Sequence, residues 1–127
     1  MDLVSIDPSD RTPLYAQLDR GLRAAIATGR LQAGDQLPTV RQLAVHLRIN
    51  ANTVARVYLE LERAGVIETR RGVGSFVSAT PAHARPRRDH TRELRAFVTR
   101  VLGDAAAAGF SIDELITELR SHQQGET

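Results

Sequence analysis

Polar side chains able to contact nucleic acid gather at the front of one amphipathic segment. The stretch RINANTVARVYLELERAG, residues 48–65, opens with four such residues, Asn50, Asn52, Thr53 and Arg56. Asparagine can pair bidentately with adenine and arginine with guanine, and threonine offers a hydroxyl to phosphate or a methyl group to thymine. Helix capping alone explains Asn50, whereas asparagine is a poor helix former at the position of Asn52. We therefore predict that Asn52, Thr53 and Arg56 contact bases or phosphates.

Further groups that favour phosphate lie on both sides of this segment. Thr39 would begin another helix, where partial positive charge and unpaired N–H groups attract anions. Arg41, in the first turn of that helix, opposes the macrodipole, and either a nucleic-acid contact or an internal salt bridge would offset that cost. In RRGVGS, Arg70 and Arg71 precede Gly72, and a basic turn of this kind can lie along phosphates or enter the minor groove.

Apolar residues at helical spacing predict the helices that would position these groups. The first helix is predicted over residues 12–29, with Thr12 as its N-cap, Pro13 as its first helical residue and Gly29 closing it. The segment that carries the polar residues is predicted to be helical over residues 51–64. These two helices would share an apolar core.

A short helix and a hairpin complete the predicted fold. Thr39 and Gln42 fit a capping box that would begin the short helix. After residue 65 the apolar pattern changes to period two, and VIETR and GSFVS flank a glycine-containing turn, which predicts a hairpin over about residues 66–78. The resulting order is that of a winged helix-turn-helix, whose second motif helix enters the DNA major groove. We predict a mainly α fold with a small β-hairpin wing and two C-terminal helices.

The last part of the chain is predicted to be a dimerisation region. Residues 79–88 mix proline, small residues and arginine, as linkers do. Two amphipathic helices follow, the first ended by Gly109 and the second begun by a capping box of Ser111 and Glu114. Two helices of this length cannot enclose a core, so either the winged domain or a second copy must cover their apolar faces. The proline-containing linker favours some independence from the winged domain, so a second copy is expected. The predicted divisions are 1–79, the winged domain, 80–90, the linker, and 91–127, the dimerisation region. The predicted dimer contacts are Leu94, Phe97, Val98, Val101, Leu102, Ile112, Leu115, Ile116 and Leu119.

The composition excludes several classes of protein. Of 127 residues, 42% are hydrophobic and 25% charged, as in soluble globular proteins. No apolar run is long enough to span a membrane, and the first residues lack the plan of a signal peptide, so a cytoplasmic protein is expected. The absence of cysteine excludes disulfides and thiolate chemistry. No metal, cofactor or enzymatic activity is expected, because no metal-ligand spacing or nucleophile–base pair involves the four histidines, His46, His83, His90 and His122.

Three segments, PLYAQL, GRLQAGDQLPTVRQLA and NTVARVYLELERAGVIETRRGVGSFV, together resemble the N-terminal domain of the GntR family of bacterial transcription regulators. The resemblance covers about residues 11–78. It implies a winged helix-turn-helix that binds operator DNA as a homodimer, with Arg41, residues 50–53 and Arg71-Gly72 at positions that touch DNA. Some relatives carry arginine where Ala51 and Ala55 stand here, so their operator sequence is not expected to transfer. The short tail resembles the YtrA-like subgroup, whose two C-terminal helices dimerise.

Two other classes of function fit these residues less well than a DNA-binding regulator does. A winged domain used to bind proteins would present an apolar or acidic face, whereas this face offers Asn, Thr and Arg. An RNA-binding protein would be expected to expose stacking aromatic residues, and the aromatic content is 4%. We predict a homodimeric repressor that reads an inverted repeat in double-stranded DNA. A small-molecule effector, if one exists, would have to bind at the dimer interface or between the two parts.

Overall fold

The computed structural model describes residues 3–79 and 89–123. Residues 80–88, which hold most of the predicted linker and His83, lie outside the described residues. The chain divides into two compact units, Met1–Ala84 and Arg85–Thr127, and each is described by itself.

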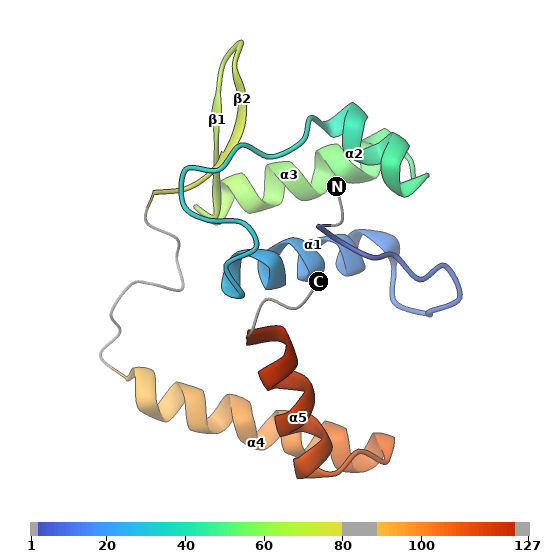
Figure 1. Ribbon diagram of the computed structural model, residues 1–127, viewed down its shortest axis with the longest axis vertical. Coiled ribbons are helices and arrows are strands. Elements are labelled where there is room, and N and C mark those ends of the chain that lie inside the picture. The colour runs from blue at the N-terminus through green and yellow to red at the C-terminus, as the bar shows by residue number, and fades with distance from the viewer. Residues whose placement is uncertain (1–2, 80–88, 124–127) are drawn as a thin grey trace. The chain divides into compact units, whose positions relative to one another are not determined.

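The first unit has the predicted winged helix-turn-helix order, so the predicted fold class is confirmed. Its helices and strands are α1 (Leu14–Ala27), α2 (Val40–Leu47), α3 (Ala51–Arg63), β1 (Ile67–Arg70) and β2 (Gly74–Val77). The strands form one antiparallel hairpin, which projects past α2 and α3 in Figure 1. The hairpin is the wing.

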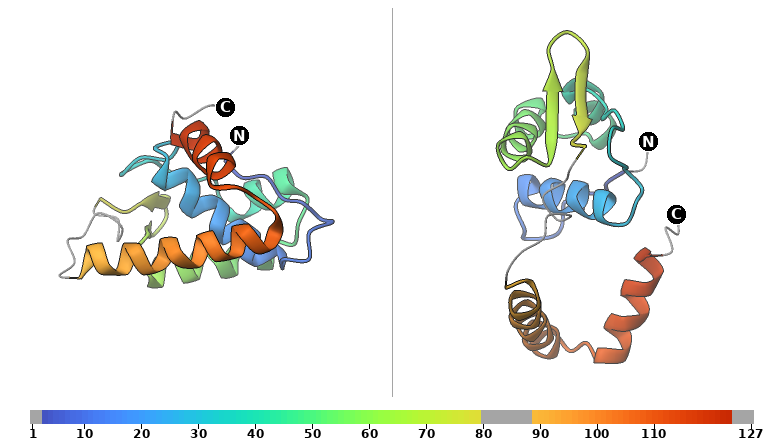
Figure 2. Two further views of the ribbon diagram at one scale, coloured as in Figure 1. Left: turned by 90° about the horizontal axis from the view of Figure 1, so that it is seen from below. Right: turned by 90° about the vertical axis from the view of Figure 1, so that its left-hand side faces the viewer.

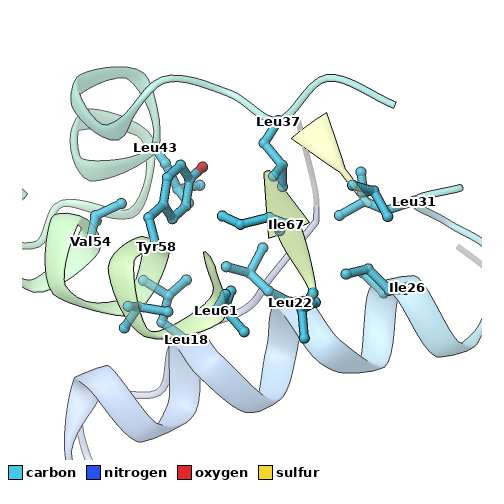
Figure 3. Close-up of a cluster of buried hydrophobic side chains, with 14 of the residues drawn as sticks. Leu18, Leu22, Ile26, Leu31, Leu37, Leu43, Val54, Tyr58, Leu61 and Ile67 are labelled. Carbon is cyan, nitrogen blue, oxygen red and sulfur yellow. The ribbon is translucent and has the colours of Figure 1, made fainter. Parts of the chain in front are cut away.

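The core of this unit is made by the apolar faces of the three helices and the inner residues of the hairpin. Figure 3 shows side chains from α1, α3 and β1 meeting in one cluster. Its largest fully buried side chains are Leu18, Leu22, Leu43, Leu61, Val54, Val57 and Val77. Tyr58 reaches from α3 to donate its hydroxyl to the Pro38 carbonyl oxygen at 2.6 Å. Burial raises the pKa of Tyr58, so the phenol stays protonated and fixes α3 against the start of α2.

The predicted start of α1 is wrong. Thr12 is not the N-cap, because Pro13 has the extended backbone of that position (φ −54°, ψ 145°) and α1 begins at Leu14. The Thr12 carbonyl oxygen instead accepts a hydrogen bond from Gln17 Nε2 at 2.9 Å. At the other end the helix stops at Ala27, and Gly29 follows with a left-handed φ of 81°. Proline therefore stands just before the helix, where its missing N–H costs nothing.

The hairpin has a three-residue turn and is extended by the connector between α1 and α2. The strands pair from Ile67↔Val77 to Arg70↔Gly74, and Gly72 in the turn has a φ of 77°. The connector adds an isolated bridge, Gln36↔Phe76, on the outer side of β2. No pattern in the sequence predicted this pairing.

The second unit consists of α4 (His90–Ala108) and α5 (Ile112–Gln123). Gly109 ends α4 with a φ of 90°. The predicted capping box is confirmed, because Glu114 Oε1 accepts from the Ser111 N–H at 2.9 Å and Ser111 Oγ from the Glu114 N–H at 3.1 Å. Among the described residues, no helix of either unit is long and apolar enough to cross a membrane.

Most of the predicted dimer contacts are exposed in the single chain. Val101 and Leu115 are half-buried, and Ala105 is buried. The other predicted contacts expose large apolar side chains, namely Leu94, Phe97, Val98, Leu102, Ile112, Ile116 and Leu119. The apolar face therefore extends well beyond what α4 and α5 bury between them.

Candidate nucleic-acid interface

The N-terminus of α2 leaves two amide groups available. Thr39 Oγ1 accepts from the Gln42 N–H at 3.0 Å, and Gln42 Oε1 accepts from the Thr39 N–H at 2.9 Å, which confirms the capping box. The amides of Val40 and Arg41 make no hydrogen bond to any described residue. They lie at the positive end of the helix dipole, the usual place for a bound phosphate.

Arg41 is exposed in the first turn of α2. The salt bridge that would offset its unfavourable position is not found among residues 3–79 and 89–123. Its side chain is therefore open to solvent.

A tight turn brings the front of α3 next to α2. Arg48 is the C-cap of α2 and has a left-handed φ of 59°, while the Ile49 N–H returns to the Ala44 carbonyl oxygen at 3.1 Å. Asn50 then caps α3, since its Oδ1 accepts from the Asn52 N–H at 2.7 Å. Capping thus engages the side-chain oxygen of Asn50, as the sequence predicted.

The residues predicted to read DNA differ in how they are held. The Asn52 side chain is exposed and makes no hydrogen bond within the described part of the chain, and Thr53 is half-buried. Arg56, by contrast, stacks on the Tyr15 ring of α1 at 4.0 Å from its centroid, and its Nε lies 3.3 Å from Glu60 Oε1. Arg56 therefore has two partners within the first unit. Its contact with Glu60 could be read from their spacing of four residues, but nothing in the sequence pointed to Tyr15.

The wing presents two arginines in different settings. Arg70 lies over the Phe76 ring at 4.2 Å and pairs with Glu68 at 3.2 Å, so the hairpin itself holds it. Arg71 is exposed and contacts no partner among the described residues. Val73, an apolar residue that was not among the predicted contacts, exposes 62% of its surface in the same turn.

These groups are supplied by α2, α3 and the wing. Figure 2 shows the three elements on the same side of α1, with the turn of the hairpin outermost. We call the available groups the donor surface: the amides of Val40 and Arg41, the guanidinium groups of Arg41 and Arg71, and the side-chain amide of Asn52. Within the described ranges, no group of three acidic or histidine side chains could hold a metal ion. The donor surface suits a polyanion that carries hydrogen-bond acceptors.

The sequence profile of the bacterial regulatory proteins of the gntR family matches residues 14–77, which contain all of this surface. The chain belongs to the GntR family. GntR proteins are DNA-binding transcription regulators, which are not a class of enzymes, so the prediction of a non-enzymatic regulator is confirmed.

Individual relatives place this GntR protein with the YtrA-like regulators. It is 43% identical over 76 residues to the transcriptional repressor YtrA of Bacillus subtilis, an alignment covering 60% of this chain and 58% of that protein. It is 32% identical over 115 residues to the regulator YhcF of the same organism, covering 89% of this chain and 92% of YhcF. The solved structure of YtrA from Sulfolobus acidocaldarius, a GntR-family transcription factor, matches with a TM-score of 0.59 and 30% identity, covering 80% of this chain and 98% of that one.

Proposed function

We propose that this GntR protein is a cytoplasmic, homodimeric repressor that binds an inverted repeat in double-stranded DNA. The observation that carries the proposal is the donor surface, whose hydrogen-bond donors come from α2, α3 and the wing and have no partner among residues 3–79 and 89–123. A surface of this kind is costly to dehydrate unless acceptors replace the lost water. Phosphate oxygens and base edges supply those acceptors.

The proposed DNA contacts are of two kinds: contacts to phosphates, which position the protein on the duplex, and contacts to base edges, which recognise the sequence. The amides of Val40 and Arg41, together with the two arginines of the donor surface, suit phosphates, which carry little sequence information. Asn52 lies in the first turn of α3, the part of a recognition helix that reaches base edges, and its amide suits adenine. Thr53 and Arg56 follow on the same helix, and stacking on Tyr15 orients the Arg56 guanidinium before any contact is made.

The exposed stripes on α4 and α5 support a dimer. Phe97 exposes 56% of its surface and Leu119 65%, and with their exposed apolar neighbours on α4 and α5 they form stripes of the kind that mark interaction surfaces. A second copy covering them would relate two donor surfaces by a twofold axis. Two recognition helices would then enter successive major grooves about 34 Å apart, which requires an inverted repeat.

The proposal can be tested before the operator is known, by measuring affinity for mixed-sequence duplex DNA across a salt series. Arg41 and Arg71 would neutralise about two phosphates per copy, so log K should fall with log salt with a slope of roughly −3.5 per dimer. Heat-denatured protein is the control. A protein with no measurable duplex binding at low salt, or with a flat salt dependence, would contradict the proposal.

A further inference from the structure

The wing is attached to the connector between α1 and α2 along most of β2. The Gly34 N–H donates to the Val77 carbonyl oxygen at 2.9 Å, and the Val77 N–H donates to the Asp35 carbonyl oxygen at 2.8 Å. The last backbone bond runs from the Leu37 N–H to the Ser75 carbonyl oxygen at 2.8 Å. The next N–H that would face β2 is that of Thr39, and it donates instead to Gln42 Oε1 at 2.9 Å, so the backbone ladder stops before the turn of the wing.

The side chain of Gln36 continues the attachment where the backbone stops. Its Nε2 donates to the carbonyl oxygen of Val73 at 3.1 Å, across 37 residues of sequence. Val73 belongs to the three-residue turn that also contains Arg71 and Gly72. Gln36 therefore links the connector to the outermost part of the wing.

Gly74 makes room for this contact. A Cβ placed on Gly74 would lie 2.6 Å from Gln36 Nε2, and the φ of 144° at this residue is one that other residues rarely adopt. The backbone of Gly74 and the amide of Gln36 are thus fitted to each other. A larger residue at position 74 would push the amide away from Val73.

The turn has little else to hold it. A two-stranded hairpin is marginally stable in water, and the only other described bond within the turn runs from the Val73 N–H to the Arg70 carbonyl oxygen at 2.9 Å. The side chains of Arg71 and Val73 are exposed. If the turn were disordered in the free protein, binding would have to order it and affinity would fall by that cost.

We propose that Gln36 is a positioning residue that holds the turn of the wing in the conformation from which Arg71 contacts DNA. This inference rests on the proposed DNA binding. Gln36 itself makes no contact with DNA and acts through the backbone of Val73, so its contribution depends on Arg71 being present.

The structural half of the proposal is tested on the full chain without DNA. Gln36→Ala removes the donor, and Gln36→Glu keeps the size while placing an acceptor opposite the Val73 oxygen. Both variants should increase the motion of the amides of residues 72–74, measured by nitrogen-15 relaxation, while the thermal midpoint stays near that of the wild type. Gln32→Ala is the control. It removes another glutamine side chain from the same connector, one that has no partner among the described residues. Unchanged relaxation in both Gln36 variants would overturn the proposal.

The functional half is tested by a double-mutant cycle with Arg71→Ala on duplex DNA. Gln36→Ala should weaken binding about three- to tenfold, the loss expected for one hydrogen bond. The same substitution should have no further effect in the Arg71→Ala background. Equal losses in both backgrounds would overturn the role of Gln36 in presenting Arg71. A wild-type protein that bound no duplex would instead contradict the proposed function, so the two failures are distinguishable.

Discussion

Asn52 is the residue expected to contribute most to recognition of the DNA base sequence. Its amide is exposed in the first turn of α3 and engages no described residue. Asn52→Ala should therefore cost about 1–3 kcal/mol on the preferred site and little on unrelated duplexes, because only the former offers a matched base edge. Fluorescence anisotropy on the two duplexes measures the difference. Equal losses on both would make Asn52 a contact to the DNA backbone.

Arg71 should behave in the opposite way. As a phosphate contact in the wing, it should strengthen binding to every duplex by a similar factor. Arg71→Ala is expected to weaken binding to all sequences and to reduce the salt slope by about one per copy. Arg70→Ala is a useful comparison, because Arg70 is already held by Phe76 and Glu68. An unchanged slope in Arg71→Ala would remove the wing from the phosphate contacts.

At the level of single residues, local contacts were predictable and long-range ones were not. The caps at Thr39 and Asn50 depend on neighbours within three residues, so the sequence was enough to find them. The stacking of Arg56 on Tyr15 joins two helices, and the bond from Gln36 to Val73 joins a connector to a turn. Contacts of this second kind depend on how the elements pack, which periodicity does not determine.

Among the elements, α5 carries a capping box that should respond to pH. Hydrogen bonds from Ser111, the backbone N–H first and the side chain second, hold the pKa of Glu114 below the ordinary glutamate value. A carboxylate with a lowered folded-state pKa stabilises the fold above its unfolded-state pKa, and that contribution is lost as pH falls through the folded-state value.

Glu114→Gln tests this expectation. Glutamine accepts the same hydrogen bond without titrating. Thermal midpoints followed by circular dichroism should therefore differ above the pH range in which glutamate titrates, where the wild type is more stable. The two midpoints should converge as the pH falls below that range. A constant difference across that range would mean that Glu114 is not linked to the stability of α5.

The elements themselves were largely readable from the sequence. The residues of α2, α3 and the hairpin lie close to the predicted ones, because caps, glycines and changes of period mark their ends. The start of α1 was misplaced, since a threonine before a proline can be read either as a cap or as part of the preceding turn. The pairing of the connector with β2 was missed, because a single bridge leaves no alternating pattern in the sequence.

For the whole molecule, the central question is what covers α4 and α5. Val101 and Leu115 are half-buried within the unit, so changing them would disturb its own packing. Phe97 and Leu119 are better probes, because they are exposed in the single chain. The double variant Phe97→Asp with Leu119→Asp should be monomeric by light scattering, keep its helical content, and bind duplex DNA more weakly than the wild type.

The control for this experiment is Ala96→Asp, which adds the same charge next to Phe97 but away from the apolar stripe. It should leave the oligomeric state unchanged. Dimers that persisted in the double variant would mean that these stripes are covered by another surface. The predicted divisions at residues 79 and 91 would then have to be reconsidered, since they assume a separate dimerisation region.

The most direct test of the central claim is selection from a random duplex library by the purified protein at about 150 mM salt, near physiological strength, followed by sequencing of the retained DNA. Two donor surfaces related by a twofold axis predict enrichment of an inverted repeat, with half-site centres about one helical turn apart or a multiple of it. The enriched half-site should lose its preference at one position in Asn52→Ala. Retention of DNA without any enriched sequence, or enrichment of a single unrepeated site, would contradict the account.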